Sequence, residues 1–356
     1  PFAMYDFDTP IDRRHTDSTK WRKYGDRDVL PLWVADMDFR APDFVLDAVR
    51  RRLDHGVLGY ADTPAELIDA FVAWLARDFG WAVHPDWLVW LPGVVPALNV
   101  ASRAIGTPGD GMVVHTPVYH PFLAVPRHGG KRAVRSPLGI EAGRWKIDLE
   151  TFAADASRAS SVLLCNPQNP TGRVYDRVEL ESFAEVCIRR DLVIVSDEIH
   201  WGFVLDEDKR HLPIASLDRD IADRTITLLA PTKTYNLAGL SSAVAVIPNP
   251  DLRRRFNRSK LGMISNVSPL AYAAALATLT DQTSWLPELI AYLRGNRDRL
   301  EAAVAAVDGL TMTHVEGTYL AWIDGRALPA TDPANYFEAH GLGFSNGATF
   351  GGRGYV

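Results

Sequence analysis

Short apolar runs that resemble buried β-strands alternate with helical patterns between residues 88 and 246. A helical pattern at 177–190, for example, lies between two of these runs. Strands that alternate with helices are typical of a mostly parallel sheet, because each helix returns the chain to the same end of the sheet. We therefore expect an α/β fold with a mostly parallel, doubly wound sheet flanked by helices. The strands are expected at 112–115, 161–165, 192–196, 225–229 and 243–247.

The length of the chain favours two domains, because 356 residues exceed a single typical domain. We expect a large α/β domain at residues 45–270. A smaller α+β domain is expected from residues 1–44 together with 271–356, where helical patterns at 269–280 and 287–307 precede a strand-like run at 318–323. Thr63 and Glu66 also predict a capping box at the start of a helix that reaches residue 79.

Lys233 is the only charged side chain between Arg224 and Asp251. Burial in so apolar a segment disfavours the ammonium form, which lowers the pKa of the lysine and leaves a neutral amine. Such an amine can attack a carbonyl and form an imine. A lysine that follows a strand and merely extends its amine into solvent explains this position equally well. The residues at the other strand ends decide between the two interpretations.

Polar side chains directly follow four of the expected strands. Ligands bind outside the carboxyl ends of the strands in an open parallel sheet, so these side chains are expected to converge. An aldehyde cofactor with a pyridine ring needs such a set: a carboxylate for the ring nitrogen, an aromatic side chain that stacks on the ring, an amide and an imidazole for the phenolic oxygen, and an amine for the imine. In chain order the candidates are Tyr119, Asn169, Asp197 with His200, and Lys233.

A phosphate-binding turn is expected at residues 92–95, between a strand-like run at 87–91 and a helical pattern at 97–105. Main-chain N–H groups of Gly93, Val94 and Val95 would then face an anion at a helix N-terminus. Each of these features alone has an ordinary structural explanation. A carboxylate after a strand is commonly a helix cap, and an Asn-Pro pair is commonly a turn. Their joint placement at successive strand ends favours a cofactor site.

Three ordered motifs resemble the signature of fold-type I pyridoxal-phosphate enzymes, the aspartate-aminotransferase superfamily. They are NPQNPTG at 166–172, SDEIH at 196–200 and PTKTYN at 231–236. The resemblance covers nearly the whole chain. Within the superfamily the sequence is most similar to the MalY/PatB group of cystathionine β-lyases, or C–S lyases. This finer match is carried by LPLWVADMDF at 30–39, HGVLGY at 55–60, HTPVYHPF at 115–122 and the final GGRGYV.

The resemblance implies pyridoxal 5'-phosphate as the cofactor. Lys233 would hold it covalently and act as the general base at the substrate Cα, and Asp197 would pair with the ring nitrogen. Tyr119, the third candidate catalytic residue, would stack on the ring. Asn169 and His200 would approach the phenolic oxygen. Asn169–Pro170 is expected to be a cis peptide.

The remaining implied contacts concern the phosphate and the assembly. The phosphate would be bound by Gly93, Val94, Val95 and Thr232. Tyr60 would reach the phosphate of a neighbouring subunit, so the expected active unit is a homodimer. Ser241 stands where many aminotransferases have a phosphate-binding arginine, a difference that the lyase group shares. Arg353 lies too early for the substrate-carboxylate arginine, so we expect that residue, and a final helix, beyond Val356.

The expected reaction is β-elimination from cystathionine or a related L-cysteine S-conjugate, which gives a thiol, pyruvate and ammonia. The choice of β-elimination depends on the finer resemblance, because a class I/II aminotransferase shares every step through removal of the Cα proton. A cofactor-free Schiff-base enzyme of the aldolase type and a regulatory binding partner without catalysis are two rival interpretations of the sequence. A dinucleotide enzyme is disfavoured because no G-x-G-x-x-G links a strand to a helix.

Composition excludes several classes of protein. A net charge of −6 argues against a nucleic-acid surface, and no apolar run reaches the length of a bilayer span. Cys165 and Cys187 lack metal-ligand spacing, and so few thiols are typical of the reducing cytoplasm. We therefore expect a cytoplasmic enzyme whose partners are a small amino-acid substrate and a second copy of the chain.

Overall fold

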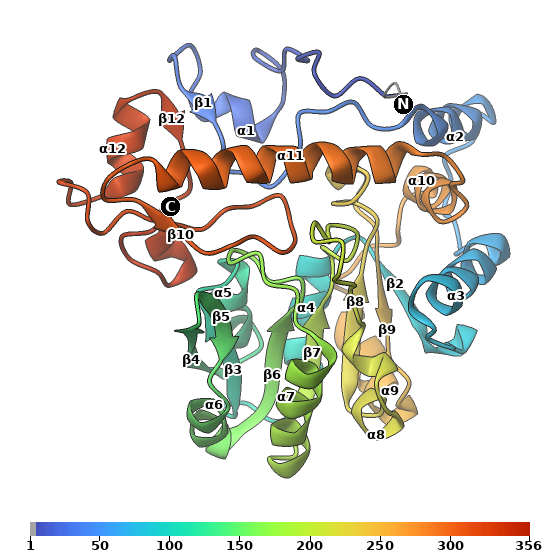
Figure 1. The fold of residues 1–356 in the computed structure, drawn as a ribbon. Helices are drawn as coiled ribbons and strands as arrows, with labels where there is room; N and C mark the ends of the chain where they lie inside the picture. Colours follow the sequence, from blue (N-terminus) through green and yellow to red (C-terminus); the bar gives the residue numbers. More distant parts are fainter. Residues whose placement is uncertain (1–4) are drawn as a thin grey trace.

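The computed structural model describes residues 5–356 and has an eight-stranded sheet at its centre (Figure 1). The strand order is β2-β9-β8-β7-β6-β3-β4-β5, and the five strands from β8 to β4 are parallel. Both edges are antiparallel, because β9 opposes β8 and β2 on one side and β5 opposes β4 on the other. The strands are β2 (Leu88–Leu91), β3 (Gly111–Thr116), β4 (Arg132–Glu141), β5 (Arg144–Ile147), β6 (Ala159–Cys165), β7 (Val193–Asp197), β8 (Thr225–Leu229) and β9 (Ala243–Val246).

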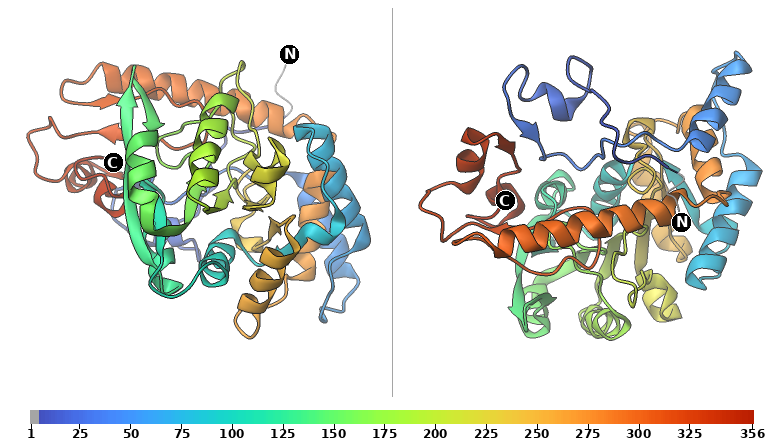
Figure 2. Two further views of the ribbon diagram at one scale, coloured as in Figure 1. Left: turned by 90° about the horizontal axis from the view of Figure 1, so that it is seen from below. Right: turned by 45° about the horizontal axis from the view of Figure 1, so that its top comes forward.

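Alternate side chains of the central strands enter two separate hydrophobic cores, because successive residues of a strand point to opposite faces of a sheet. This two-sided burial explains why the strands are continuous apolar runs. One core contains Val114, Leu163 and Val195 and is covered by α4 (Val94–Ala104), α5 (Pro121–His128) and α9 (Pro250–Lys260). The other contains Val113, Val162 and Ile194 and is covered by α6 (Leu149–Asp155), α7 (Arg177–Arg189) and α8 (Arg219–Ala222). Figure 2 shows the two helix layers from below. The expected α/β class is confirmed.

Local sequence signals set the ends of several helices. Helix α7 begins at a capping box in which the carboxylates of Asp176 and Glu179 each accept the main-chain N–H of the other residue. The capping box expected at Thr63 is wrong. Helix α3 (Ala65–Phe79) has Pro64 at its N-cap, which places Thr63 outside the helix, and the Thr63 hydroxyl donates to the Tyr272 hydroxyl instead.

The terminal segments pair with each other above the sheet. Strand β1 (Leu30–Pro31) runs parallel to β12 (Leu342–Gly343), and β10 (Thr311–Met312) is antiparallel to β11 (Ile323–Asp324). Helix α11 (Trp285–Ala305) crosses the same end of the molecule in Figure 1. The division into domains at residues 45 and 270 remains a prediction. The other helices are α1 (Thr19–Arg22), α2 (Asp43–Asp54), α10 (Pro269–Leu279) and α12 (Pro333–Ala339).

The strand expected at 318–323 is wrong for most of its length, because regular pairing begins only at Ile323. Thr318 has a φ of 70°, which lies in the left-handed region and breaks an extended strand. Within residues 5–356, no helix combines the length and the apolar character that a membrane span requires.

Candidate active site

A cavity of about 210 Å³ lies at the carboxyl ends of β6, β7 and β8. These strand ends point toward the C-terminal segment in Figure 1. The structure brings nine of the ten expected site residues to its wall. Tyr60 is the exception, since it lies outside the cavity and is fully exposed. The expected residues in the wall are Gly93, Val94, Val95, Tyr119, Asn169, Asp197, His200, Thr232 and Lys233.

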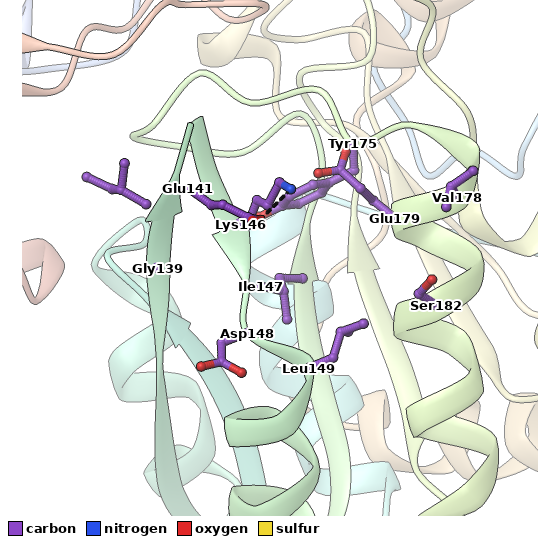
Figure 3. A pocket seen from close by; sticks show the side chains of 11 residues that line it. Gly139, Glu141, Lys146, Ile147, Asp148, Leu149, Tyr175, Val178, Glu179 and Ser182 are labelled. Atoms are coloured by element: carbon purple, nitrogen blue, oxygen red, sulfur yellow. Dashed lines mark hydrogen bonds and ion pairs between the residues drawn. The ribbon is translucent and has the colours of Figure 1, made fainter. Parts of the chain in front are cut away.

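A larger cavity of about 470 Å³ lies elsewhere, between the β4–β5 hairpin and the start of α7 (Figure 3). Its charged groups already have protein partners, since Lys146 binds Glu141 at 2.6 Å and Glu179 binds Arg173 at 2.7 Å. The smaller cavity instead combines a buried amine, a buried carboxylate and unpaired polar atoms. We therefore place the candidate active site in the smaller cavity.

Asp197 is the last residue of β7 and is buried between its neighbours Cys165 and Leu228 on the adjacent strands. Its carboxylate accepts the Ile199 N–H at 3.1 Å. Burial raises the pKa of Asp197 to about 7, with Glu198 adding to the rise, while the Ile199 N–H and Lys233 oppose it. A carboxylate in this position is stabilised by a cation, which a protonated pyridine ring nitrogen supplies.

Lys233 lies in a turn that follows β8, and hydrogen bonds from Tyr235 N to Pro231 O and from Leu237 N to Thr232 O hold the turn. Its Nζ donates to the Ala35 carbonyl oxygen at 2.5 Å. Burial lowers the pKa of Lys233, although the charges of Asp36 and Asp197 oppose the shift. The amine is therefore closer to its neutral, nucleophilic form than a lysine in water.

Two polar atoms beside the cavity are buried without a hydrogen-bond partner among residues 5–356, namely Asn169 Oδ1 and His200 Nδ1. Burial lowers the pKa of His200 to about 3, and Lys233 adds to this effect, so its imidazole is neutral at physiological pH. Buried polar atoms normally have partners, so unpaired ones at a cavity wall indicate that a polar ligand belongs there. The Tyr119 N–H donates to the Asn169 carbonyl oxygen at 3.0 Å, which fixes these two strand ends relative to each other.

The N-terminus of α4 forms another part of the cavity wall. Gly93 is the N-cap residue, and no side chain caps the helix. The first main-chain N–H groups of a helix attract an anion, and here they are not satisfied by a cap side chain. Thr232 and Ser241 add hydroxyl groups to the same wall. The donor set therefore fits pyridoxal phosphate: an anion site, a buried carboxylate, a buried amine and two unpaired polar atoms.

The protein-family model for aminotransferase class I and II matches residues 27–340. The chain belongs to this family. It is 38% identical to cystathionine β-lyase PatB of Bacillus subtilis, over 92% of this chain and 86% of the relative. The crystal structure of OvoB superposes with a TM-score of 0.96 at 46% identity, and cystalysin of Treponema denticola, whose crystal structure contains pyridoxal 5'-phosphate, with 0.93 at 32%. Each structural match covers 99% of this chain and 93% of the other.

Three further expectations from the sequence concern the Asn169–Pro170 peptide, Ser241 and Arg353. The Asn169–Pro170 peptide is cis, as expected. Ser241, which takes the sequence position of the arginine expected in many aminotransferases, lines the cavity. Its φ of 47° lies in the left-handed region. Arg353 does not line the cavity.

The sequence did not predict that the N-terminal segment contributes to the candidate active site. Ala35 is 198 residues from Lys233, and its contact is made by a main-chain carbonyl, which no residue type marks. Asn236 belongs to the PTKTYN motif, yet its type and position alone indicate no role. Its side chain binds Met37 N, Met37 O and Phe39 O at 2.8–3.0 Å, so it fastens residues 37–39 to the lysine turn.

Proposed function

We propose that the chain is a pyridoxal-phosphate-dependent C–S β-lyase that cleaves cystathionine or a related L-cysteine S-conjugate to a thiol, pyruvate and ammonia. The observation that carries the proposal is the placement of the Lys233 amine and the buried Asp197 carboxylate in one cavity, beside unpaired atoms of Asn169 and His200. The similarity to PatB, which is named a cystathionine β-lyase, favours elimination over amino-group transfer.

The residues of the chain divide the work as follows. Bound cofactor supplies an electron sink for the bond electrons that the substrate Cα gains when it loses its proton. Asp197 would keep the ring nitrogen protonated, and the Asn169 amide and the His200 imidazole would hydrogen-bond the phenolic oxygen. Tyr119 packs on the ring. Lys233 removes the Cα proton, after which the Cβ–S bond breaks, the thiol leaves and the remaining three-carbon fragment hydrolyses to pyruvate and ammonia.

Lysine removal tests the cofactor assignment. Lys233→Ala is expected to abolish both the imine absorbance band and turnover, because no other amine lines the cavity within residues 5–356. The variant is expected to fold, since loss of the lysine side chain removes only its hydrogen bond to the Ala35 carbonyl. Circular dichroism and thermal melting check folding. Activity equal to that of the wild type would contradict the assignment.

Product analysis tests the reaction. Incubation with cystathionine is expected to give pyruvate and a thiol in equal amounts without an added keto acid. A half-reaction that depends on a keto acid, with no thiol released, would instead identify an aminotransferase. The Lys233→Ala variant serves as the blank in both assays.

The same proposal includes a homodimer in the cytoplasm, with Tyr60 at the phosphate of the second copy. Val57, Leu58 and Tyr60 support it, since they form an apolar stretch that is 58–103% exposed. Exposed apolar surface often marks a site of contact with another protein. The two cysteines are buried and free, as is typical of a reducing compartment.

A further inference from the structure

The Ala35 carbonyl oxygen accepts two hydrogen bonds at the candidate site. One comes from Lys233 Nζ at 2.5 Å and the other from the Tyr319 hydroxyl at 2.9 Å. These donors are 198 and 284 residues away from Ala35 in sequence. The carbonyl therefore joins the lysine turn, the N-terminal segment and the C-terminal segment at one atom. Tyr319 itself does not line the cavity.

The backbone that presents Tyr319 is held in an unusual conformation. Thr318 is fully buried and has a φ of 70°, a value that a β-branched residue rarely adopts. Its N–H donates to the Phe203 carbonyl at 2.7 Å, and the Gly317 N–H donates to the Gly172 carbonyl at 2.8 Å. Surroundings that enforce a rare conformation commonly do so near a functional site, where a particular direction of a side chain matters.

The ring of Tyr319 is fixed as firmly as its backbone. It packs edge-on against Phe203 at 4.8 Å and His200 at 5.9 Å between ring centroids. Burial raises the pKa of Tyr319 far above its ordinary value, and Asp36 adds to the rise. Burial therefore favours the protonated hydroxyl, which is the form that donates to the Ala35 carbonyl oxygen.

We propose that Tyr319 is a positioning residue for Lys233, because it fixes the direction of the Ala35 carbonyl against which the free lysine amine rests. The amine is free before it captures the cofactor and again while substrate occupies the cofactor. At both times the Ala35 carbonyl oxygen, as a fixed hydrogen-bond acceptor, holds the lysine nitrogen at the cavity. The lone pair of the nitrogen is then left for the aldehyde carbon of the cofactor or for the Cα proton of the substrate. This inference rests on the proposed function, which supplies the need for a free amine.

Tyr319→Phe removes the hydroxyl and keeps the ring packing, so it tests the proposal directly. We expect kcat for β-elimination to fall about tenfold with KM changed less than about twofold, since poor alignment of a catalytic group mainly slows the chemical step. We also expect the full-length chain, freed of cofactor, to capture added pyridoxal phosphate several-fold more slowly, measured as the rise of the imine absorbance band. Tyr319→Met, which also cannot donate, is expected to lose the same two rates.

Tyr292→Phe is the matched control, because its hydroxyl also donates one hydrogen bond, to Asp8 Oδ1 at 2.8 Å, and Tyr292 does not line the cavity. This control is expected to keep both rates, and thermal melting shows whether each variant folds. Wild-type capture and kcat in a folded Tyr319 variant would overturn the proposal. Equal losses in the Tyr292→Phe control would overturn it as well, since they would indicate general loosening of the protein. If the wild type captures cofactor but cleaves no thioether, the proposed reaction fails while the capture rates still decide the role of Tyr319.

Discussion

Asp197 is a carboxylate whose surroundings oppose its own charge. It is 4% exposed, and its carboxylate accepts a main-chain hydrogen bond from the Ile199 N–H at 3.1 Å. Without cofactor, burial raises its pKa to about 7, whereas its ordinary value is 3.8. The folded chain therefore binds a proton that the unfolded chain releases between these two pH values. Stability that depends on this proton is complete below pH 3.8 and is lost as the pH rises toward 7.

Asp197→Asn is expected to remove this pH dependence from the cofactor-free chain. Relative to the variant, the wild type should lose about 3 kcal/mol of unfolding free energy as the pH rises from 4 to 7, because each pKa unit corresponds to about 1.4 kcal/mol and the group is partly titrated at both ends of this interval. Urea denaturation at several pH values measures the difference. Asp191→Asn is the control, since it removes the same charge from a side chain that is 98% exposed. Parallel pH curves for wild type and Asp197→Asn would contradict the expectation.

At the scale of an element, the position of the segment between β10 and β11 depends on one buried carboxylate, that of Glu316. Glu316 is 3% exposed and accepts hydrogen bonds from the Val174 N–H and from Arg173 at 2.9 Å. Arg144 binds its other oxygen at 2.7 Å, and Lys209 lies at 3.4 Å. Burial alone would raise the pKa of Glu316, but these hydrogen bonds and charges outweigh it and lower the pKa. The network holds the segment that carries Tyr319 against the large sheet.

Glu316→Gln is expected to destabilise the chain by about 3 kcal/mol, because it leaves the buried Arg173 with one fewer anion. A carboxylate with a lowered pKa stabilises the fold above its ordinary value of 4.5, and this contribution is lost as the pH falls below it. The gap between wild type and variant should therefore narrow in acid. Denaturant titration at pH 7 and pH 4 measures it. In Glu181→Gln, which breaks the exposed pair with Arg177, a loss of less than about 0.5 kcal/mol is expected.

The parts of the fold that sequence predicts correctly are those with local signals. The ends of β6, β7 and β8 are predictable because buried parallel strands are continuous apolar runs, and Asn169, Asp197 and Lys233 follow these runs closely. The apolar pattern around Thr318 wrongly predicts a strand, because its left-handed φ is imposed by partners at Phe203 and Gly172, which are remote in sequence. Ala35 escapes sequence reasoning because main-chain contacts leave no pattern in side-chain types.

At the scale of the whole molecule, Tyr60 is the expected site residue that this chain leaves unused. Its side chain is fully exposed, whereas the other nine expected residues line the cavity. The exposure of Tyr60 fits the proposal that it completes the site of a second copy. In a two-fold symmetric dimer each copy would then supply one such residue to the other.

Mixing two impaired variants tests this exchange. Tyr60→Ala should weaken cofactor binding, and Lys233→Ala should be inactive. In a mixed dimer, one site pairs the intact Lys233 of one copy with the intact Tyr60 of the other. Random reassociation should therefore restore about a quarter of wild-type activity, since half of the dimers are mixed and one of their two sites is intact. Activity that stays at the level of the separate variants would show that Tyr60 does not act across an interface.

The hydrogen bonds on the Ala35 carbonyl have a consequence for how the protein matures. A ribosome releases Ala35 early, but the tyrosine that orients its oxygen is synthesised 284 residues later. Contacts between such distant positions form late in folding, because the intervening chain must first be ordered. The appearance of the yellow colour of the vitamin B6 imine in a newly made chain should thus report completion of the fold, and it should lag behind the formation of the helices.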